Sequence, residues 1–389
     1  MSTLSRVPPA RGNASMMQTS FAASLVGLEA PRSGHPIDVK PYVTSAISTN
    51  RTVTPNLVND PTGAAGLDVK YALTQGISAD VTVKTDFAQV EADEQQVNLT
   101  RFSLFFPEKR DFFLENQGMF AFGGVQVSGN FNNNQNESAP ILFYSRNIGL
   151  NGAAGLLAPR VVPLNVGGRV TGRAGRYSIG LVNVQTGAED PTLPIAMPST
   201  NFSVLRLRRD VLRKSSVGLI ATGRSVSING TGRNVEYGVD GTFGFFDNLQ
   251  FNTYWARTDS TGRHGDDSSY RLQMDYNADR YGLQLERLMV GSDFNPEMGF
   301  LRRGNMLRNY VQARFSPRPA SMPSIRRFRY QGFLNNIQNR QGILESREAE
   351  GQFQIEFQTG DEFRTAYHDY YERSEEHTSE LQSRFGISY

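Results

Sequence analysis

Alternation of apolar and polar residues is the dominant pattern of this chain. The clearest case is residues 270–277 (YRLQMDYN), where tyrosine, leucine and methionine alternate with arginine, glutamine, aspartate and asparagine. The same period of two occurs in residues 37–44, 68–73, 80–84, 236–245, 249–255 and 353–358, and strand-like patterning returns at residues 141–146. Segments of about 8–12 residues, separated by turns such as residues 246–248 and 360–361, predict roughly 14 or more antiparallel β-strands.

Two all-β architectures have this pattern. In a soluble sandwich the apolar face lines the core, whereas in a membrane barrel it meets lipid and the polar face lines the lumen. Long strands, short turns, charged polar faces and aromatic residues at strand ends favour the barrel. We therefore predict an antiparallel up-and-down transmembrane β-barrel over residues 35–372, with outward-facing Leu249, Phe251, Leu272 and Met274. Arginines of the polar face are expected to line the lumen and to favour anionic groups: Arg169, Arg173, Arg206, Arg208 and Arg271.

Residues 86–136 interrupt the strands. Their first part is dense in acids and phenylalanines, and residues 123–138 are rich in glycine and asparagine. Because an unpaired buried charge is costly, the acids are expected to pair with Arg101, Lys109, Arg110 or lumen arginines. Pro107 is expected to begin a short helix with Glu108 near its positive end. We predict a plug-like insert in or across the lumen, with these residues as its candidate site: Asp86, Glu91, Asp93, Glu94, Asn98, Arg101, Phe105, Phe106, Pro107, Glu108, Lys109, Arg110 and Glu115.

The acids of the insert also suggest two kinds of chemistry. The four acids between residues 86 and 94 could bind a hard cation such as calcium, but their spacing does not match an EF-hand loop. A glycosidase needs two carboxylates about 5–10 Å apart, which Glu108 could form with Glu115 or with Asp93. No G-x-S-x-G elbow and no nucleotide-binding glycine motif supports another enzyme class. We predict no metal and no cofactor, and we assign no catalytic residue.

Composition narrows the partners. The chain has 389 residues, a formal net charge of +2 and no cysteine. A charge this mild, without a basic run, argues against nucleic acid, and the absence of cysteine excludes disulfides and thiol nucleophiles. No run of about 18 apolar residues predicts a transmembrane helix. Residues 1–34, rich in Ser, Pro, Gly and Ala, are typical of a linker or the remnant of a preceding module.

The C-terminal residues break the strand pattern. Residues 373–383 (RSEEHTSELQS) resemble, residue for residue, the translation of a common sequencing-library adapter. We therefore expect residues 373–389 to be a non-native tail and the chain to be a metagenomic fragment, truncated at both ends. The alternative is an ordinary polar tail.

Several segments together resemble a known group of proteins. It is an uncharacterised bacterial family in which a family-9-like carbohydrate-binding module precedes an outer-membrane β-barrel, and whose members are often labelled membrane-associated hydrolases. The resemblance implies a barrel, but it brings no assigned catalytic residue. The chain differs from the family in having no such N-terminal module. The matching segments are residues 66–71 (GLDVKY), 86–93 (DFAQVEAD), 96–99 (QVNL), 105–110 (FFPEKR), 112–115 (FFLE), 143–149 (FYSRNIG) and 293–300 (DFNPEMGF).

The sequence thus leads to one preferred hypothesis and two alternatives. The preferred function is a plugged or gated passage, or a surface protein, in the outer membrane of a bacterial cell, linked to carbohydrate or polymer handling. Its expected partners are the lipid bilayer and a carbohydrate or other polymer, with no nucleic acid. The alternatives are a membrane-anchored hydrolase acting on carbohydrate and a soluble carbohydrate-binding β-protein.

Overall fold

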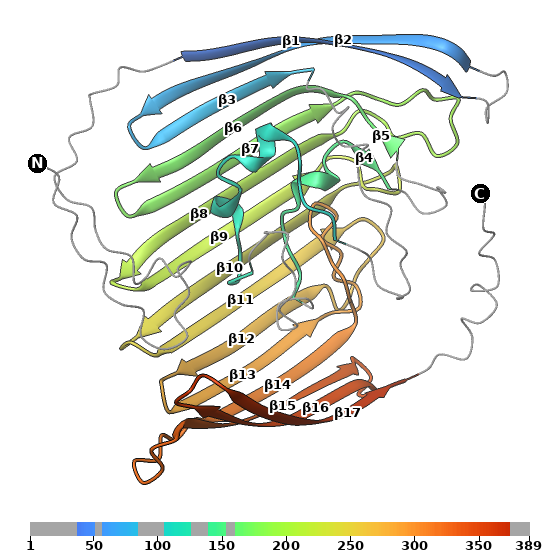
Figure 1. Ribbon diagram of the computed structural model, residues 1–389. Coiled ribbons are helices and arrows are strands. Elements are labelled where there is room, and N and C mark those ends of the chain that lie inside the picture. Colours follow the sequence, from blue (N-terminus) through green and yellow to red (C-terminus); the bar gives the residue numbers. More distant parts are fainter. Residues whose placement is uncertain (1–36, 51–56, 85–104, 126–138, 153–159, 374–389) are drawn as a thin grey trace, which may run out of the picture.

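One large antiparallel sheet makes up most of the structure. The computed structural model describes residues 37–50, 57–84, 105–125, 139–152 and 160–373. Fifteen strands pair with their neighbours in chain order, which confirms the predicted all-β, up-and-down antiparallel architecture (Figure 1). The strands are β1 (Ile37–Asn50), β2 (Leu57–Thr74), β3 (Ile77–Val83), β6 (Leu164–Ala174), β7 (Tyr177–Thr186), β8 (Asn201–Leu212), β9 (Ser215–Arg224), β10 (Asn234–Phe245), β11 (Leu249–Ser260), β12 (Ser268–Asn277), β13 (Tyr281–Val290), β14 (Met306–Phe315), β15 (Ile325–Asn339), β16 (Leu344–Phe357) and β17 (Glu362–Glu372).

The remaining elements are short. Strands β4 (Leu150–Asn151) and β5 (Arg160–Val161) form a separate two-stranded sheet. One helical turn, α1 (Asp111–Leu114), precedes the 3₁₀ turn η2 (Gln117–Phe120), and a second 3₁₀ turn, η3 (Ser145–Asn147), lies further along the chain. No helix in the described part of the chain is long and apolar enough to cross a membrane.

The two ends of the sheet differ in the length of their connections. At one end, here called the turn end, β6 joins β7 through residues 175–176, β8 joins β9 through residues 213–214, and β10 joins β11 through residues 246–248. At the other end, here called the loop end, longer connections span residues 187–200, 225–233 and 291–305, and β3 leads to β6 through residues 84–163. Two connections depart from this trend: residues 316–324 at the turn end and residues 340–343 at the loop end. Residues 105–125 of this last connection lie across one face of the sheet (Figure 1), which we call the inner face.

The alternation seen in the sequence separates the inner face from the outer face. On β12, Arg271 points to the inner face and is 1% exposed, whereas its neighbour Leu272 points outward and is 58% exposed. Leu249, Phe251 and Met274 share the outer face with Leu272, because Phe251 is the register partner of Met274 and the others are spaced by two residues. Charged side chains are therefore buried inside the curved sheet, and large apolar ones are exposed outside it.

Aromatic side chains gather at two heights of the outer face. Near the loop end, the rings of Tyr237 and Trp255 lie 6.0 Å apart. Near the turn end, stacked or tilted rings follow one another across four strands: Tyr281, Phe315, Tyr330 and Phe353. Along β10, Tyr237 and Phe245 are separated by about 27 Å of strand, or about 20 Å along a barrel axis at the usual tilt.

Within the described residues, β1 and β17 each pair with a strand on one side only. Both edge strands are correspondingly exposed, and on β17 the tyrosines Tyr367 and Tyr370 are 74% and 64% exposed.

Two local expectations from the sequence are wrong. Residues 141–146 do not form a strand: apart from a single bridge between Ile141 and Phe300, they make a turn that ends in η3. Their apolar side chains are buried because this turn packs into the core cluster, not because it joins the sheet. Pro107 does not begin a helix either, since α1 starts only at Asp111 and Glu108 lies in the irregular segment before it.

Candidate functional site

Residues 105–125, here called the insert, are seated on the inner face by aromatic rings. Three phenylalanines lie against inner-face glycines, so that a Cβ atom on the glycine would meet a ring carbon at 3.5, 2.8 and 2.8 Å respectively: Phe112 at Gly167, Phe120 at Gly180 and Phe122 at Gly238. Each of these glycines belongs to a different strand, β6, β7 or β10. The inner face of the sheet, here called the wall, thus lacks a side chain at each glycine, and this leaves room for the phenylalanine ring.

Arg169 of β6 binds the middle of the insert. It is 3% exposed and donates to the backbone carbonyls of Phe112 and Glu115, the latter at 2.6 Å. On the wall it forms an ion pair with Asp80 of β3 at 2.8 Å. Glu115 also pairs with Lys70 of β2. Burying this arginine is tolerable because carboxylates and carbonyls satisfy its donors.

A second set of charges binds the end of the insert. The Gly123 backbone N–H donates to Asp240 of β10 at 3.1 Å, and its carbonyl accepts from Arg271 of β12 at 3.3 Å. Arg206 of β8 pairs with Asp240 at 2.6 Å and also lies over the Phe122 ring, 5.4 Å from its centre. The insert is therefore bound by backbone hydrogen bonds as well as by its rings.

The ion pair between Arg206 and Asp240 depends on a glycine between them. Gly218 of β9 is the register partner of Asp240 on β10, and Arg206 of β8 lies two residues from Arg208, the other register partner of Gly218. A Cβ atom at Gly218 would stand 2.6 Å from the Arg206 Nη1 atom and 2.7 Å from Asp240 Oδ1. The missing side chain lets the two charged groups meet across the intervening strand.

Further along the inner face, charges form a buried ladder. Glu286 of β13 accepts from Arg271 at 2.5 Å and from Arg308 of β14 at 3.0 Å. Arg308 also donates to Asn335 of β15 at 2.8 Å. Arg271 belongs to this set of charges and also donates to the Gly123 carbonyl, so the set is continuous with the residues that bind the insert.

The five arginines expected in the lumen therefore have different surroundings. Arg169, Arg206 and Arg271 contact the insert and wall carboxylates, as described above. Arg173 lies near the turn end, half exposed, and pairs with Asp210. Arg208 lies on the inner face, partly buried, and its Nε atom has no hydrogen-bond partner among the described residues. The arginines in contact with the insert are already engaged by protein groups.

Glu108 and Arg110 join the insert to the residues that follow it. The buried Glu108 carboxylate accepts from the Arg110 side chain at 2.7 Å and from the Ser145 hydroxyl at 2.7 Å. Arg110 also donates to the carbonyls of Ser145 and Ile148. Burial raises the pKa of Glu108, but the hydrogen bonds and charge of Arg110, together with Ser145, outweigh this and hold the pKa below its usual value.

Three separate segments of the sequence meet beside the pair of Glu108 and Arg110. Tyr144 donates to the Phe106 carbonyl, and its ring lies 5.0 Å from that of Phe105 and 5.7 Å from that of Phe300. Asn147 donates to the carbonyl of Gly299 at 2.5 Å. Residues 105–110, 143–149 and 293–300, which carry the family resemblance, thus pack into one unit at the loop end.

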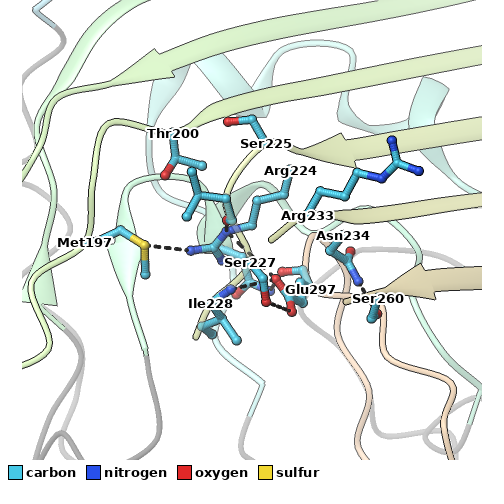
Figure 2. Close-up of polar contacts among 12 residues, drawn as sticks. Met197, Thr200, Arg224, Ser225, Ser227, Ile228, Arg233, Asn234, Ser260 and Glu297 are labelled. Carbon is cyan, nitrogen blue, oxygen red and sulfur yellow. Dashed lines mark hydrogen bonds and ion pairs between the residues drawn. The ribbon is translucent and has the colours of Figure 1, made fainter. Parts of the chain in front are cut away.

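Glu297 ties this unit to the loop after β9. Its carboxylate accepts from the Ser227 hydroxyl at 2.7 Å and from the Ile228 backbone N–H at 2.8 Å, and Arg224 lies 3.9 Å away (Figure 2). Arg224 donates in turn to the Val226 carbonyl and to the sulfur of Met197. The loop-end connections are therefore fastened to one another as well as to the sheet.

Sequence reasoning missed the acidic partners on the wall: Asp80, Asp240, Glu286 and Glu297. The first three stand at polar positions of alternating strands, so the pattern marked them as inner-face residues without indicating their partners. The predicted residues Asp86, Glu91, Asp93, Glu94, Asn98 and Arg101 lie outside the described residues. Among the others, Phe106 contacts Arg146 through its ring, Pro107 accepts from Arg146, and Lys109 donates its N–H to Glu108.

The described insert offers little to hydrolytic or metal chemistry. Glu108 is bound by Arg110 and Glu115 by Lys70 and Arg169, so neither is a free general acid or nucleophile. The second pair considered from sequence includes Asp93, which lies outside the described residues. In the part of the chain that the structure describes, no three acidic or histidine side chains are grouped to hold a metal ion.

Comparison with known proteins gives a family but little detail. No curated protein matches the chain. Crystal structures of Pseudomonas aeruginosa OccK8 (OprE) and Acinetobacter baumannii OccAB2 are similar at 8% identity and TM-scores of 0.35 and 0.37, with 87% and 88% of this chain and 85% of each of those chains covered. Pseudomonas aeruginosa OprD is similar at 13% identity and a TM-score of 0.33, over 86% of this chain and 81% of that one. Likeness at this level assigns no function.

The match to a family model is extensive. It spans residues 37–385, from the first described strand into the segment that we expect to be a non-native tail. It also includes all three segments that meet at the loop end, and it confirms the resemblance to an uncharacterised family. The chain belongs to the family described as domain of unknown function DUF5916.

Proposed function

We propose that the protein is a bacterial outer-membrane β-barrel in which the insert narrows or closes a passage through the lumen. The outer face supports a membrane location, because its exposed aliphatic residues lie between two levels of aromatic side chains. This is the arrangement of lipid-facing barrel surfaces, whose apolar band is about 25 Å tall. Buried arginines and carboxylates on the opposite face fit a polar lumen.

The contact between the insert and the wall carries the proposal. Residues 112–124 contact inner-face residues on β6, β7, β8, β10, β11 and β12. A segment bound across so many strands of a curved wall occupies space that a solute would otherwise use. Glu115 of the insert pairs with Lys70 and Arg169, and the Gly123 backbone binds Asp240 and Arg271. Pairing of this kind between buried charges and their surroundings is what a stable plug or constriction requires.

The lengths of the connections suggest an orientation. In bacterial outer-membrane barrels the periplasmic turns are short and the extracellular loops are long. We therefore infer that the turn end faces the periplasm and that the insert enters the barrel from the extracellular side. We also propose a carbohydrate or another polymer as the transported solute.

The alternatives lead to different expectations. A hydrolase needs two carboxylates in an open site, whereas the described carboxylates of the insert are bound by cations. A soluble carbohydrate-binding protein would bury the face that carries Leu272, whereas this side chain is 58% exposed. Both observations favour the passage.

Planar-bilayer conductance of the full chain tests the proposal. Asn116 donates to Thr171 of β6 at 3.1 Å, and the chain has no native cysteine. Asn116→Cys combined with Thr171→Cys, joined by a short thiol cross-linker, holds the insert on the wall. Phe120→Ser combined with Phe122→Ser removes two of its anchors. We expect the cross-linked protein to keep a low conductance and the anchor variant to conduct more.

Single-cysteine variants treated with the same reagent are the control for its chemical effect. If the cross-linked protein, the anchor variant and the unmodified protein all conduct equally, the insert does not restrict the passage. If none conducts across a range of voltages, the passage itself is contradicted.

A further inference from the structure

The turn end of the last four strands carries an excess of positive charge on the inner face. Four arginines gather there, Arg314 of β14, Arg327 and Arg329 of β15, and Arg364 of β17, with Glu356 of β16 and Glu362 of β17 as opposing charges. Arg329 is repelled by Arg327 and Arg364 and attracted by both glutamates. Arg314 is also attracted by Asp275 and Asp279, and Glu356 pairs with both Arg326 and Arg327. The positive charge that no ion pair balances among the described residues therefore lies at Arg329 and Arg364.

Two of the arginines have structural partners. Arg314 donates to the backbone carbonyls of Asp279 and Ala278 at 3.0 and 2.6 Å, which closes the turn between β12 and β13. Arg327 pairs with Glu356 at 2.5 Å. These contacts explain why both side chains are held on the wall.

The other two arginines have no such partners. The Nε atom of Arg329 is buried without a hydrogen-bond partner, and neither Arg329 nor Arg364 forms an ion pair or side-chain hydrogen bond among the described residues. Arg329 and Arg364 stand in one row, on either side of Gln354. Neighbouring strands are about 4.8 Å apart, so the two Cα atoms are roughly 10 Å apart. Their long side chains can reach one small ion between them.

This row lies at the turn end of the inner face. Along β15, Arg329 is eight residues from Ile337, the register partner of Arg308, or about 27 Å of strand. On the outer face, Tyr330 and Phe353 mark the same level. The contacts of the insert described above end at β12, so the row is open to a solute approaching from the turn end.

We propose that Arg329 and Arg364 form an oxyanion-binding site for solutes bearing a carboxylate or phosphate group. A guanidinium group carries only donors, is always charged, and binds both anions through paired N–H groups. The inference rests on the proposed function, since it names the solute class that the passage would collect at its turn end. It also assigns anion recognition to Arg329 and Arg364 instead of the arginines that bind the insert.

Binding and conductance must be measured separately. In detergent micelles at low salt, calorimetric titration of the full chain with inorganic phosphate and with citrate compares the two oxyanions. Arg329→Gln combined with Arg364→Gln is expected to weaken binding of the preferred anion at least tenfold. The matched control, Arg209→Gln combined with Arg280→Gln, removes the same charge from arginines that lie over the turn-end rings Tyr177 and Tyr281, and it is expected to bind normally.

Four outcomes are informative. Equal loss of binding in both double variants would show a general charge effect and overturn the site, as would unchanged binding in the Arg329 and Arg364 variant. Selective loss for phosphate or for citrate identifies the group that is recognised. Selective loss in a protein that never conducts would uphold the site and contradict the passage. In conducting protein, the site variant is expected to shift the reversal potential in a salt gradient towards cation selectivity.

Discussion

A leucine in place of Gly180 tests whether the contacts between phenylalanine rings and inner-face glycines, here called ring seats, hold the insert on the wall. The Phe120 ring lies on Gly180, and it is only 4% exposed because Phe143 packs against it with ring centres 5.1 Å apart. A Cβ atom at residue 180 would meet two ring carbons at 2.8 and 2.9 Å, and the rest of a leucine would need the same space. Gly180→Leu is therefore expected to displace the ring while leaving the strand in place.

The size of the effect follows from the burial of that ring. Fully burying a phenylalanine side chain contributes about 1.5–3 kcal/mol, and a nearly buried ring loses most of this when displaced. A loss of about 2–3 kcal/mol corresponds to a local opening roughly 30 to 150 times more populated, since 1.4 kcal/mol is tenfold. Local opening of this kind is detected by backbone hydrogen exchange.

The assay is hydrogen exchange followed by mass spectrometry on the full chain in micelles. Peptides covering residues 112–124 should exchange faster in Gly180→Leu by that factor, and peptides from β13 and β14 should not change. Gly168→Leu is the matched control, because a Cβ atom at Gly168 meets no atom within 4 Å. Equal exchange of the insert in the two variants would refute the idea that ring seats hold it.

Three further predictions concern the wall, the loop-end unit and the membrane. Gly218→Ala should lower the free energy of unfolding by about 1–3 kcal/mol through overpacking of the ion pair beside it, measured by thermal unfolding against Gly223→Ala, where a Cβ has open space. Because the pKa of Glu108 is depressed, stability should be lost as pH falls below about 4.3, and Glu108→Gln should flatten the unfolding profile between pH 3 and 6. Trp255, the only tryptophan of the chain, is 42% exposed on the outer face, so brominated lipids should quench its fluorescence in vesicles; unquenched emission would favour a soluble protein.

Much of the sheet was predictable because its information is local. The alternation in residues 270–277 assigns each side chain to a face without knowledge of its neighbours, and the structure places Arg271 inside and Leu272 outside accordingly. The same local rule failed for residues 141–146. Their alternation has the period of a strand, but their apolar residues pack against residues 298–300 in a loop. Periodicity records which residues are buried, not what buries them.

The candidate site was less predictable because its contacts are distant in the sequence. Gly123 is bound by Asp240 and Arg271, and Asn147 by Gly299, and no local pattern links such positions. The family motifs did mark the three segments of the loop-end unit, but not that they meet. The ring seats are harder still to predict from sequence, since Gly180 becomes informative only when the structure shows Phe120 packed against it.

The inner-face arginines divide by what neutralises them, and this division separates holding the insert from receiving a solute. Arg206 has a wall carboxylate and the Phe122 ring of the insert. Arg169 and Arg271 each have a wall carboxylate and donate to a backbone carbonyl of the insert, so releasing the insert would leave part of their hydrogen-bonding capacity unmet. An unsatisfied buried donor costs about 1–3 kcal/mol, which favours the docked state at each of these positions. Arg329 and Arg364 have no comparable partner among the described residues, so an incoming anion competes there with water and not with the insert. A solute could thus bind at the turn end without first displacing the insert, and opening of the passage would be a separate step with its own free energy.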